Sequence, residues 1–282
     1  MDNKIKVAVI GGSGIYKLDG ITVKNKIFLD TPFGAPSTDI LECEVDGCSF
    51  YFLARHGLGH KVTPSEVNYR ANIYALKKLG ATTIVSISAV GSLKEEYAPK
   101  HFVVVDQFID WTKGQRKRTF FDEGIVGHVS CANPVEMNLA DRLYDSLQKA
   151  GVTSHKGGSY ICIEGPQFST KAESNIYRSF GAGVIGMTNV PEAYLAKEAG
   201  MAYATVAMVT DYDCWKEEHC TVQEIMDVMK SNYESAQKFV AEAIPSLVKN
   251  PISFQPENQF AIMTDKSLHS TRHEEILNVI LK

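Results

Sequence analysis

Short apolar runs rich in β-forming residues alternate with helical patterns along most of this sequence. The first run covers residues 5–10 and leads into the glycine-rich segment 11–14, as expected for a buried strand that ends in a tight turn. Later runs lie at 50–54, 82–88, 102–106, 159–163, 183–187 and 202–209. Helical patterns lie at 63–80, 134–150, 170–180, 190–199 and 221–243. This alternation predicts an α/β fold in which a central mixed β-sheet is flanked by helices.

Two of the expected helices carry N-terminal signals. Thr63 can cap a helix, Pro64 suits the first helical position, and Glu66 can reach back to complete a capping box. Thr221 and Glu224 form a second capping box ahead of a long amphipathic segment. We therefore expect helices to begin near residues 63 and 221.

The chain length is compatible with a single domain. Of its 282 residues, 44% are hydrophobic, which is enough for one large core. No internal repeat or low-complexity linker interrupts the sequence, but prolines and scattered polar residues fill the segment 248–270. We therefore expect one domain over residues 1–282, with a C-terminal arm and a last short helix from about residue 248.

The charge balance argues against nucleic-acid binding. The formal net charge is −4, whereas neutralising a phosphate backbone needs clustered cations. We interpret the short basic run 116–118 as a solvated loop. The sequence shows neither a signal peptide nor an apolar run long enough to span a bilayer, so a cytoplasmic protein without a membrane partner is expected.

The six cysteines do not form a recognisable framework. None belongs to a C-x-x-C pair, and free thiols are expected in a reducing compartment. Cys214, His219 and Cys220 do not have the spacing of zinc ligands, so no metal site is expected.

Three predicted strands end in residues that suit an anion. Ser13 lies in the glycine-rich segment, Arg55 and His56 follow a second strand, and Ser88 and Ala89 end a third. Ligands of open α/β sheets gather outside the carboxyl ends of strands. Taken singly, the glycine-rich segment is equally compatible with a structural turn, and a surface Arg55 with a structural His56 is the better interpretation of the second segment. Together the three segments favour a small anion site.

Two carboxylates and an aromatic ring are further candidates. Asp211 and Asp213 follow the apolar run 202–209, where partial burial can raise a carboxyl pKa and make it a general acid. A polar turn with solvated aspartates is an equally good interpretation. Phe168 follows a Gly-Pro turn and could stack on a planar base, although a core phenylalanine is the commoner case.

Taken together, these segments resemble the trimeric purine nucleoside phosphorylases, over about residues 5–263. The segments that carry the resemblance are 11–14, 30–34, 55–60, 64–72, 164–168, 187–188, 191–192 and 196–198. The sequence Thr-Asp-Tyr-Asp-Cys-Trp at 210–215, with Lys216, is similar to the branch of this family that acts on 5'-methylthioadenosine.

The resemblance implies a nucleoside phosphorylase-like fold, a homotrimer and a pentosyltransferase of purine and methionine salvage. The reaction would split 5'-methylthioadenosine with inorganic phosphate into adenine and 5-methylthioribose 1-phosphate. Phosphate would be a co-substrate, and no metal or organic cofactor would be needed.

The resemblance also assigns roles to individual residues. Those implied to hold phosphate are Ser13, Arg55, His56, Ser88, Ala89 and Thr188. Those implied to contact the nucleoside are Phe168, Ser169, Met187, Val222 and Ile225, with His128 and Met263 reaching the methylthio end from a neighbouring subunit. Asp211 would assist the leaving base, and Asp213 would face the purine beside it.

Two positions discriminate between purines. In the phosphorylases of 6-oxopurine nucleosides, a glutamate stands at the position of Ser169 and an asparagine at that of Asp211. An acidic acceptor suits the amino group or a protonated ring nitrogen of adenine. Ser169 and Asp211 therefore indicate adenine.

Three other functions remain as alternatives. The nearest is a phosphorylase of 6-oxopurine nucleosides or methylthioinosine, and a more remote one is a nucleoside-binding protein without catalysis. A binder of nucleoside alone has no need of the phosphate site that Arg55 and Thr188 suggest. A dinucleotide-dependent dehydrogenase is disfavoured because Lys17 stands where the third glycine of the fingerprint belongs.

Overall fold

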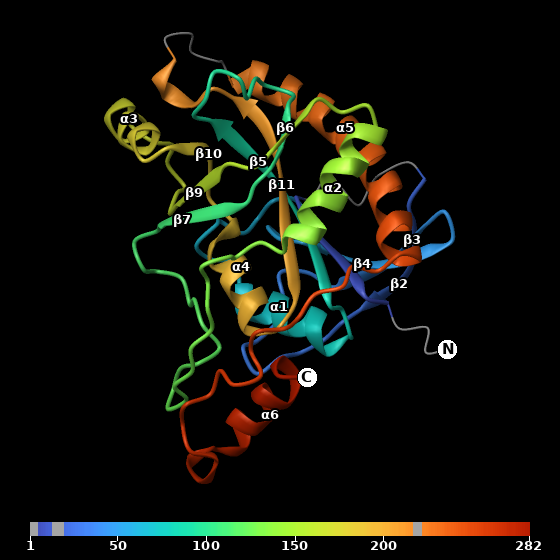
Figure 1. Cartoon of the computed structure of the whole chain (residues 1–282), viewed down its shortest axis with the longest axis vertical. Coiled ribbons are helices and arrows are strands. Elements are labelled where there is room, and N and C mark those ends of the chain that lie inside the picture. The colour runs from blue at the N-terminus through green and yellow to red at the C-terminus, as the bar shows by residue number, and fades with distance from the viewer. Residues whose placement is uncertain (1–4, 13–19, 217–221) are drawn as a thin grey trace.

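The computed structural model describes residues 5–12, 20–216 and 222–282 (Figure 1). Its strands are β1 (Val7–Gly11), β2 (Thr22–Ile27), β3 (Ile40–Val45), β4 (Cys48–Ala54), β5 (Thr83–Ser92), β6 (Phe102–Val104), β7 (Gln107–Trp111), β8 (Ser154–Lys156), β9 (Ser159–Ile163), β10 (Ala182–Gly186) and β11 (Ala202–Asp211). Its α-helices are α1 (Tyr69–Lys78), α2 (Met137–Lys149), α3 (Lys171–Ser179), α4 (Asn189–Glu198), α5 (Val222–Lys249) and α6 (Thr271–Ile280).

Strands β5 and β11 form the centre of one mixed sheet. They run parallel to each other along most of their length, from Ala202 opposite Thr83 to Val209 opposite Val90. Strand β1 lies between β5 and β4 and is parallel to both, whereas β10 meets only the end of β5 and is antiparallel to it. Nearly every residue of β1, β5 and β11 is buried, which explains why these strands appear as continuous apolar runs in the sequence.

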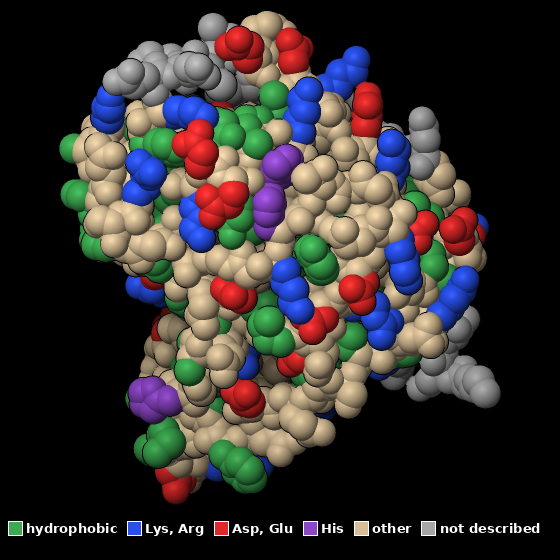
Figure 2. Space-filling model, turned by 45° about the horizontal axis from the view of Figure 1, so that its top comes forward, with side chains coloured by type: hydrophobic (Ala, Val, Ile, Leu, Met, Phe, Trp, Pro, Cys, Tyr) green, Lys and Arg blue, Asp and Glu red, His purple; other side chains and the backbone are tan. Residues whose placement is uncertain are grey.

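Helices cover the sheet in two groups. Helix α5 packs against α2 and β11, while α1 packs against α4 and α6, and α4 contacts β5 and β11 (Figure 1). The prediction of a mixed sheet flanked by helices is therefore confirmed. Lys, Arg, Asp and Glu side chains are interspersed over the face drawn in Figure 2. No helix in the described part of the chain combines the length and apolarity needed to cross a membrane.

The helix expected to begin at Thr63 begins later. Glu66 does reach back, because its Oε2 accepts hydrogen bonds from the backbone N–H and the hydroxyl of Thr63 at 3.1 and 2.7 Å. These bonds close a turn, however, and the helix is capped instead by Asn68, whose side chain accepts from the N–H of Ala71 at 3.2 Å. The expected start near residue 63 was therefore wrong, because Asn68 and not Thr63 caps the helix.

Arg116 corrects the interpretation of the basic run as a solvated loop. Its side chain is 1% exposed and its Nε donates to Glu164 Oε1 at 3.0 Å. Its remaining nitrogens donate to the carbonyls of Val190, Ile163 and Glu164, at distances of 2.6, 3.2 and 2.9 Å. A buried cation is tolerated because every side of it meets an acceptor. Only Lys117 and Arg118 are exposed as expected.

The chain after α5 wraps back onto the body. Asn258 is buried and its side-chain amide donates to the carbonyls of Glu198 and Ile280, at 2.9 and 2.8 Å. Helix α6 buries Ile276, Leu277 and Ile280. The segment after residue 248 is thus joined to α4 and α6 by buried contacts; its treatment as an arm of a single domain stays a prediction.

Replacing Arg116 should destabilise the protein strongly. Arg116→Met would leave the Glu164 carboxylate and three carbonyls without their buried partner, and breaking such a pair costs about 3–5 kcal/mol. Urea denaturation should show the loss as a lower midpoint. The matched variant Lys117→Met alters an exposed neighbour and should change the free energy of unfolding by less than about 0.5 kcal/mol. Equal effects of the two variants would contradict this role of Arg116.

Candidate active site

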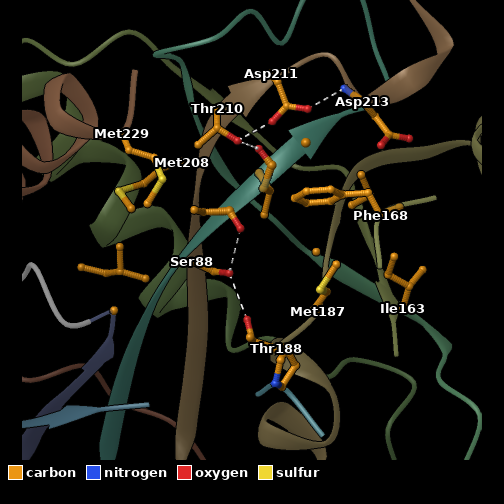
Figure 3. Close-up of a pocket in the computed structure, with 18 of the residues that line it drawn as sticks. Ser88, Ile163, Phe168, Met187, Thr188, Met208, Thr210, Asp211, Asp213 and Met229 are labelled. Carbon is orange, nitrogen blue, oxygen red and sulfur yellow. Dashed lines mark hydrogen bonds between the residues drawn. The ribbon is translucent and has the colours of Figure 1, made fainter. Parts of the chain in front are cut away.

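A cavity of about 430 Å³ opens where β5 and β11 end (Figure 3). Its walls come from the end of β4, from β5, from the loop after β9, from the ends of β10 and β11, and from α5. The predicted site residues that line it are Arg55, His56, Ser88, Ala89, Phe168, Ser169, Met187, Thr188, Asp211 and Asp213. Strand-end residues from distant parts of the sequence are thus brought together in one cavity, in the position expected for an α/β sheet.

One end of the cavity presents a pair of hydroxyl groups. Ser88 Oγ in β5 lies 3.0 Å from Thr188 Oγ1, and both side chains are buried. Thr188 also directly precedes α4, but Val190 has non-helical backbone angles, so the regular turns of α4 begin only after that residue. Beneath the pair lies Tyr160, whose hydroxyl accepts from the N–H of Thr188 at 3.4 Å. A Cβ at Gly186 would come within 1.9 Å of that hydroxyl, so glycine is required there.

Arg55 lies behind the hydroxyl pair, in a fully buried polar network. Its Nε donates to Glu192 Oε2 at 2.7 Å, and its Nη2 donates to Glu192 Oε1 at 2.9 Å and to Ser86 Oγ at 2.7 Å. The same carboxylate accepts from the hydroxyls of Ser86 and Tyr203, each at 2.9 Å. Asn189 extends the network, because its Nδ2 lies 2.9 Å from Ser86 Oγ and 2.7 Å from the Tyr203 hydroxyl. The guanidinium is therefore held in one orientation.

The opposite end of the cavity presents the two carboxylates. Asp211 Oδ1 accepts from the Thr210 hydroxyl at 2.6 Å, and Asp211 Oδ2 accepts from the backbone N–H of Asp213 at 3.0 Å. Burial raises the pKa of Asp211, although these two hydrogen bonds act in the opposite direction. Burial also raises the pKa of Asp213, whose side chain accepts from Ser174 Oγ. Figure 3 shows both carboxylates across the cavity from Ser88 and Thr188.

The wall between the two ends carries an aromatic ring, a hydroxyl group and a methionine. Phe168 is 81% exposed, so its ring is not part of the core and is free to contact a ligand. Ser169 lies next to it with a buried Oγ that has no hydrogen-bond partner among the described residues. Met187 packs closely on Gly165, where an added Cβ would lie 2.4 Å from the methionine sulfur. A buried hydroxyl without a partner beside a free aromatic ring suits a planar heterocycle with polar edges.

Among the cavity residues that the sequence analysis did not name as site residues are Met208, Met229 and Tyr233. All three line the cavity, and Figure 3 shows Met208 and Met229 close together on the side opposite Phe168. A signal was available in α5, since positions 225, 229 and 233 recur at the spacing of one helical face.

Five predicted residues are not placed in the cavity. Ser13, and the side chains of Val222 and Ile225, lie outside the described residues. His128 and Met263 are exposed and do not line the cavity of their own chain. They lie close to each other, because Gly127 bridges to Ile262 and the N–H of Met263 donates to the carbonyl of Val126 at 2.9 Å. No group of three or more His, Cys, Asp or Glu residues able to hold a metal ion occurs within 5–12, 20–216 and 222–282.

Comparison with known proteins gives a consistent result. Residues 6–245 match the family model described as the phosphorylase superfamily. The S-methyl-5'-thioadenosine phosphorylase of Geobacter sulfurreducens is 48% identical over 278 residues, which is 98% of this chain and 97% of the relative.

Solved structures support the same assignment. A methylthioadenosine phosphorylase from an Antarctic soil metagenomic library superposes with a TM-score of 0.93 at 44% identity, over 100% of both chains. The methylthioadenosine phosphorylase of Schistosoma mansoni in complex with adenine gives a TM-score of 0.82 at 37% identity, covering 86% of this chain and 92% of that one. The resemblance seen in the sequence is confirmed: the chain belongs to the phosphorylase superfamily and, within it, to the family of the methylthioadenosine phosphorylases.

Proposed function

We propose that the protein splits 5'-methylthioadenosine with inorganic phosphate into adenine and 5-methylthioribose 1-phosphate. The observation that carries this proposal is the placement of a partly buried carboxyl of raised pKa, Asp211, across one cavity from the hydroxyls of Ser88 and Thr188. The family membership and the adenine bound to the Schistosoma relative support the same choice of substrate.

The anion end of the cavity would bind phosphate. Ser88 and Thr188 offer hydroxyl donors, and Arg55 has one Nη1 N–H left after its bonds to Glu192, to Ser86 and to the carbonyl of Ile87, the last at 3.3 Å. His56, Ala89 and Ser13 complete the proposed set. No metal or organic cofactor is part of this proposal.

The chemistry needs one proton at the opposite end. A phosphate oxygen forms a bond to C1' while the bond from C1' to N9 of adenine breaks, and the electron pair of that bond stays with adenine. Protonated Asp211 gives its proton to N7 and so neutralises the leaving base. Asp213 holds Asp211 through its backbone N–H and faces the purine with its own carboxyl. The negative phosphate stabilises the cationic sugar from below.

The base end of the cavity favours adenine over a 6-oxopurine. Phe168 would stack on the ring, Met187 would lie under the ribose, and Ser169 and the two aspartates offer partners for the polar edge. A hypoxanthine or guanine base needs a donor facing O6. The proton of Asp211 goes to N7 in the proposed step, so Asp213 as a carboxylate would give O6 no donor, whereas it would accept from the N6 amino group of adenine. The 6-oxopurine alternative is therefore the weaker one.

The methylthio end would be completed by a second copy of the chain. Val222 and Ile225 would contact this end from α5, while the exposed His128 and Met263, on two paired segments, would reach it from a neighbouring subunit in a homotrimer. We also place the enzyme in the cytoplasm, in keeping with the free thiols of Cys43, Cys48, Cys131, Cys162 and Cys214.

The reaction is tested by measuring the released base and sugar phosphate. The purified protein is incubated with methylthioadenosine, adenosine or inosine, each with and without phosphate. Adenine should appear only with phosphate, and fastest from methylthioadenosine. Hypoxanthine from inosine as the main product would overturn the substrate assignment, and binding of methylthioadenosine without turnover would support a non-catalytic binder.

Asp211→Asn should lower turnover by about 10²–10⁴-fold, because the amide keeps the shape of the side chain but has no proton to give. In the wild-type enzyme, turnover should fall as pH rises through the pKa of Asp211, since only the protonated form acts as the acid; the variant should lack this fall. The exposed carboxylate of Asp141, in Asp141→Asn, serves as the control. Near-normal turnover of Asp211→Asn would remove Asp211 from the acid role.

A further inference from the structure

The anion end of the cavity has little unpaired positive charge to attract an anion. Among the described residues that line the cavity there is no lysine, and the only arginine is Arg55. The charge of Arg55 is matched by Glu192, whose two oxygens lie 2.7 and 2.9 Å from its nitrogens. An anion bound here is therefore recognised mainly by the number and direction of hydrogen bonds.

His56 contributes a lone pair to this end. Its Nδ1 lies 2.9 Å from the carbonyl oxygen of Val62, which can only accept, so Nδ1 carries the proton and donates it. A second bond, from the N–H of Val62 to the carbonyl of His56 at 3.1 Å, closes the same loop and fixes the ring. His60 stacks on that ring with centroids 4.5 Å apart. In the neutral ring, Nε2 must then be an acceptor, and it has no hydrogen-bond partner among the described residues.

The surroundings of His56 keep its ring neutral. The side chain is 7% exposed. Burial lowers the pKa of His56 to about 4, and the neighbouring positive charge of Arg55 acts in the same direction, while the hydrogen bond to Val62 opposes the shift. At neutral pH the ring therefore offers a lone pair at Nε2 instead of a second N–H.

We propose that His56 makes this site selective for oxyanions that carry a proton, phosphate and arsenate, over sulfate. Inorganic phosphate keeps at least one O–H at neutral pH, and that group can donate to Nε2. Sulfate has no proton to donate, so its oxygens would face the lone pair of Nε2 without a hydrogen bond. The donors at the site, Ser88, Thr188 and the remaining Nη1 N–H of Arg55, serve both anions equally. This inference rests on the proposed use of phosphate and adds that the hydrogen bond from its O–H group to His56 Nε2 distinguishes phosphate from sulfate.

The test compares sulfate with phosphate in steady-state assays. Inhibition by sulfate is measured against varied phosphate at constant ionic strength, with methylthioadenosine saturating, and is expressed as the ratio of the sulfate Ki to the phosphate KM. Arsenate replaces phosphate in a parallel series. In the wild-type enzyme sulfate should bind about 10–100-fold more weakly than phosphate, and arsenate should support turnover much as phosphate does.

Two substitutions of His56 test the role of the Nε2 lone pair. His56→Gln can turn an amide N–H toward the anion, and His56→Leu removes the acceptor without adding a donor, so both should lower the ratio, His56→Gln by about tenfold or more. His155→Gln is the matched control, because His155 is a partly buried histidine outside the cavity whose pKa is also lowered, chiefly by burial. The control should leave the ratio unchanged, and melting temperatures report whether each variant is folded.

The outcomes separate this inference from the proposed function. Release of adenine that does not depend on phosphate would contradict the proposed function itself. If turnover requires phosphate but sulfate competes as strongly as phosphate in the wild-type enzyme, the selectivity is overturned. An unchanged ratio in both folded His56 variants would likewise remove His56 from this role.

Discussion

The buried ion pair between Arg55 and Glu192 is the interaction on which the rest of the structure depends. Both side chains are 1% exposed, and charges at that depth are tolerated only when they are paired and hydrogen-bonded. The pair joins the end of β4 to the start of α4, and Ser86 and Tyr203 connect it to the central strands β5 and β11. The elements that form the anion end of the cavity are thus fastened to one another by a single polar network in an apolar interior.

This arrangement separates two electrostatic tasks across a short distance. Hydroxyl groups and a neutral imidazole occupy one end of the cavity, and partly desolvated carboxyls occupy the other. A displacement at a sugar carbon needs an anion on one side and a proton donor on the other, and the two must not neutralise each other first. The apolar walls formed by Phe168, Met187 and Met208 lie between the two ends and leave room for the nucleoside.

Much of the fold was predictable because burial leaves a pattern in the sequence. The strands with both faces covered form continuous apolar runs, and residues at or just after the ends of those runs, such as Ser88 and Asp211, line the cavity. What could not be predicted depends on contacts between distant segments. The sequence alone does not reveal that Arg116 forms a buried ion pair with Glu164, or that Arg55 forms one with Glu192.

The start of the first helix was predicted wrongly because two candidate caps, Thr63 and Asn68, lie close together in the sequence. Glu66 reaches back to the N–H of Thr63 as in a capping box, but the Thr63 hydroxyl donates to that carboxylate instead of accepting from the N–H of Glu66, and Asn68 caps the helix. Met229 was missed for the opposite reason, since a methionine on a helix is ordinarily a core residue and only the tertiary structure turns it toward a ligand.

Because the cavity draws its walls from β4, β5, β10, β11 and α5, no fragment of the chain contains a binding site. During synthesis the site can exist only after the residues of α5 have emerged, when about four-fifths of the sequence has been made. A ligand that binds there stabilises the native chain as a whole, by an amount set by its concentration relative to Kd. A higher concentration of substrate in the cell would therefore also slow proteolysis of the protein.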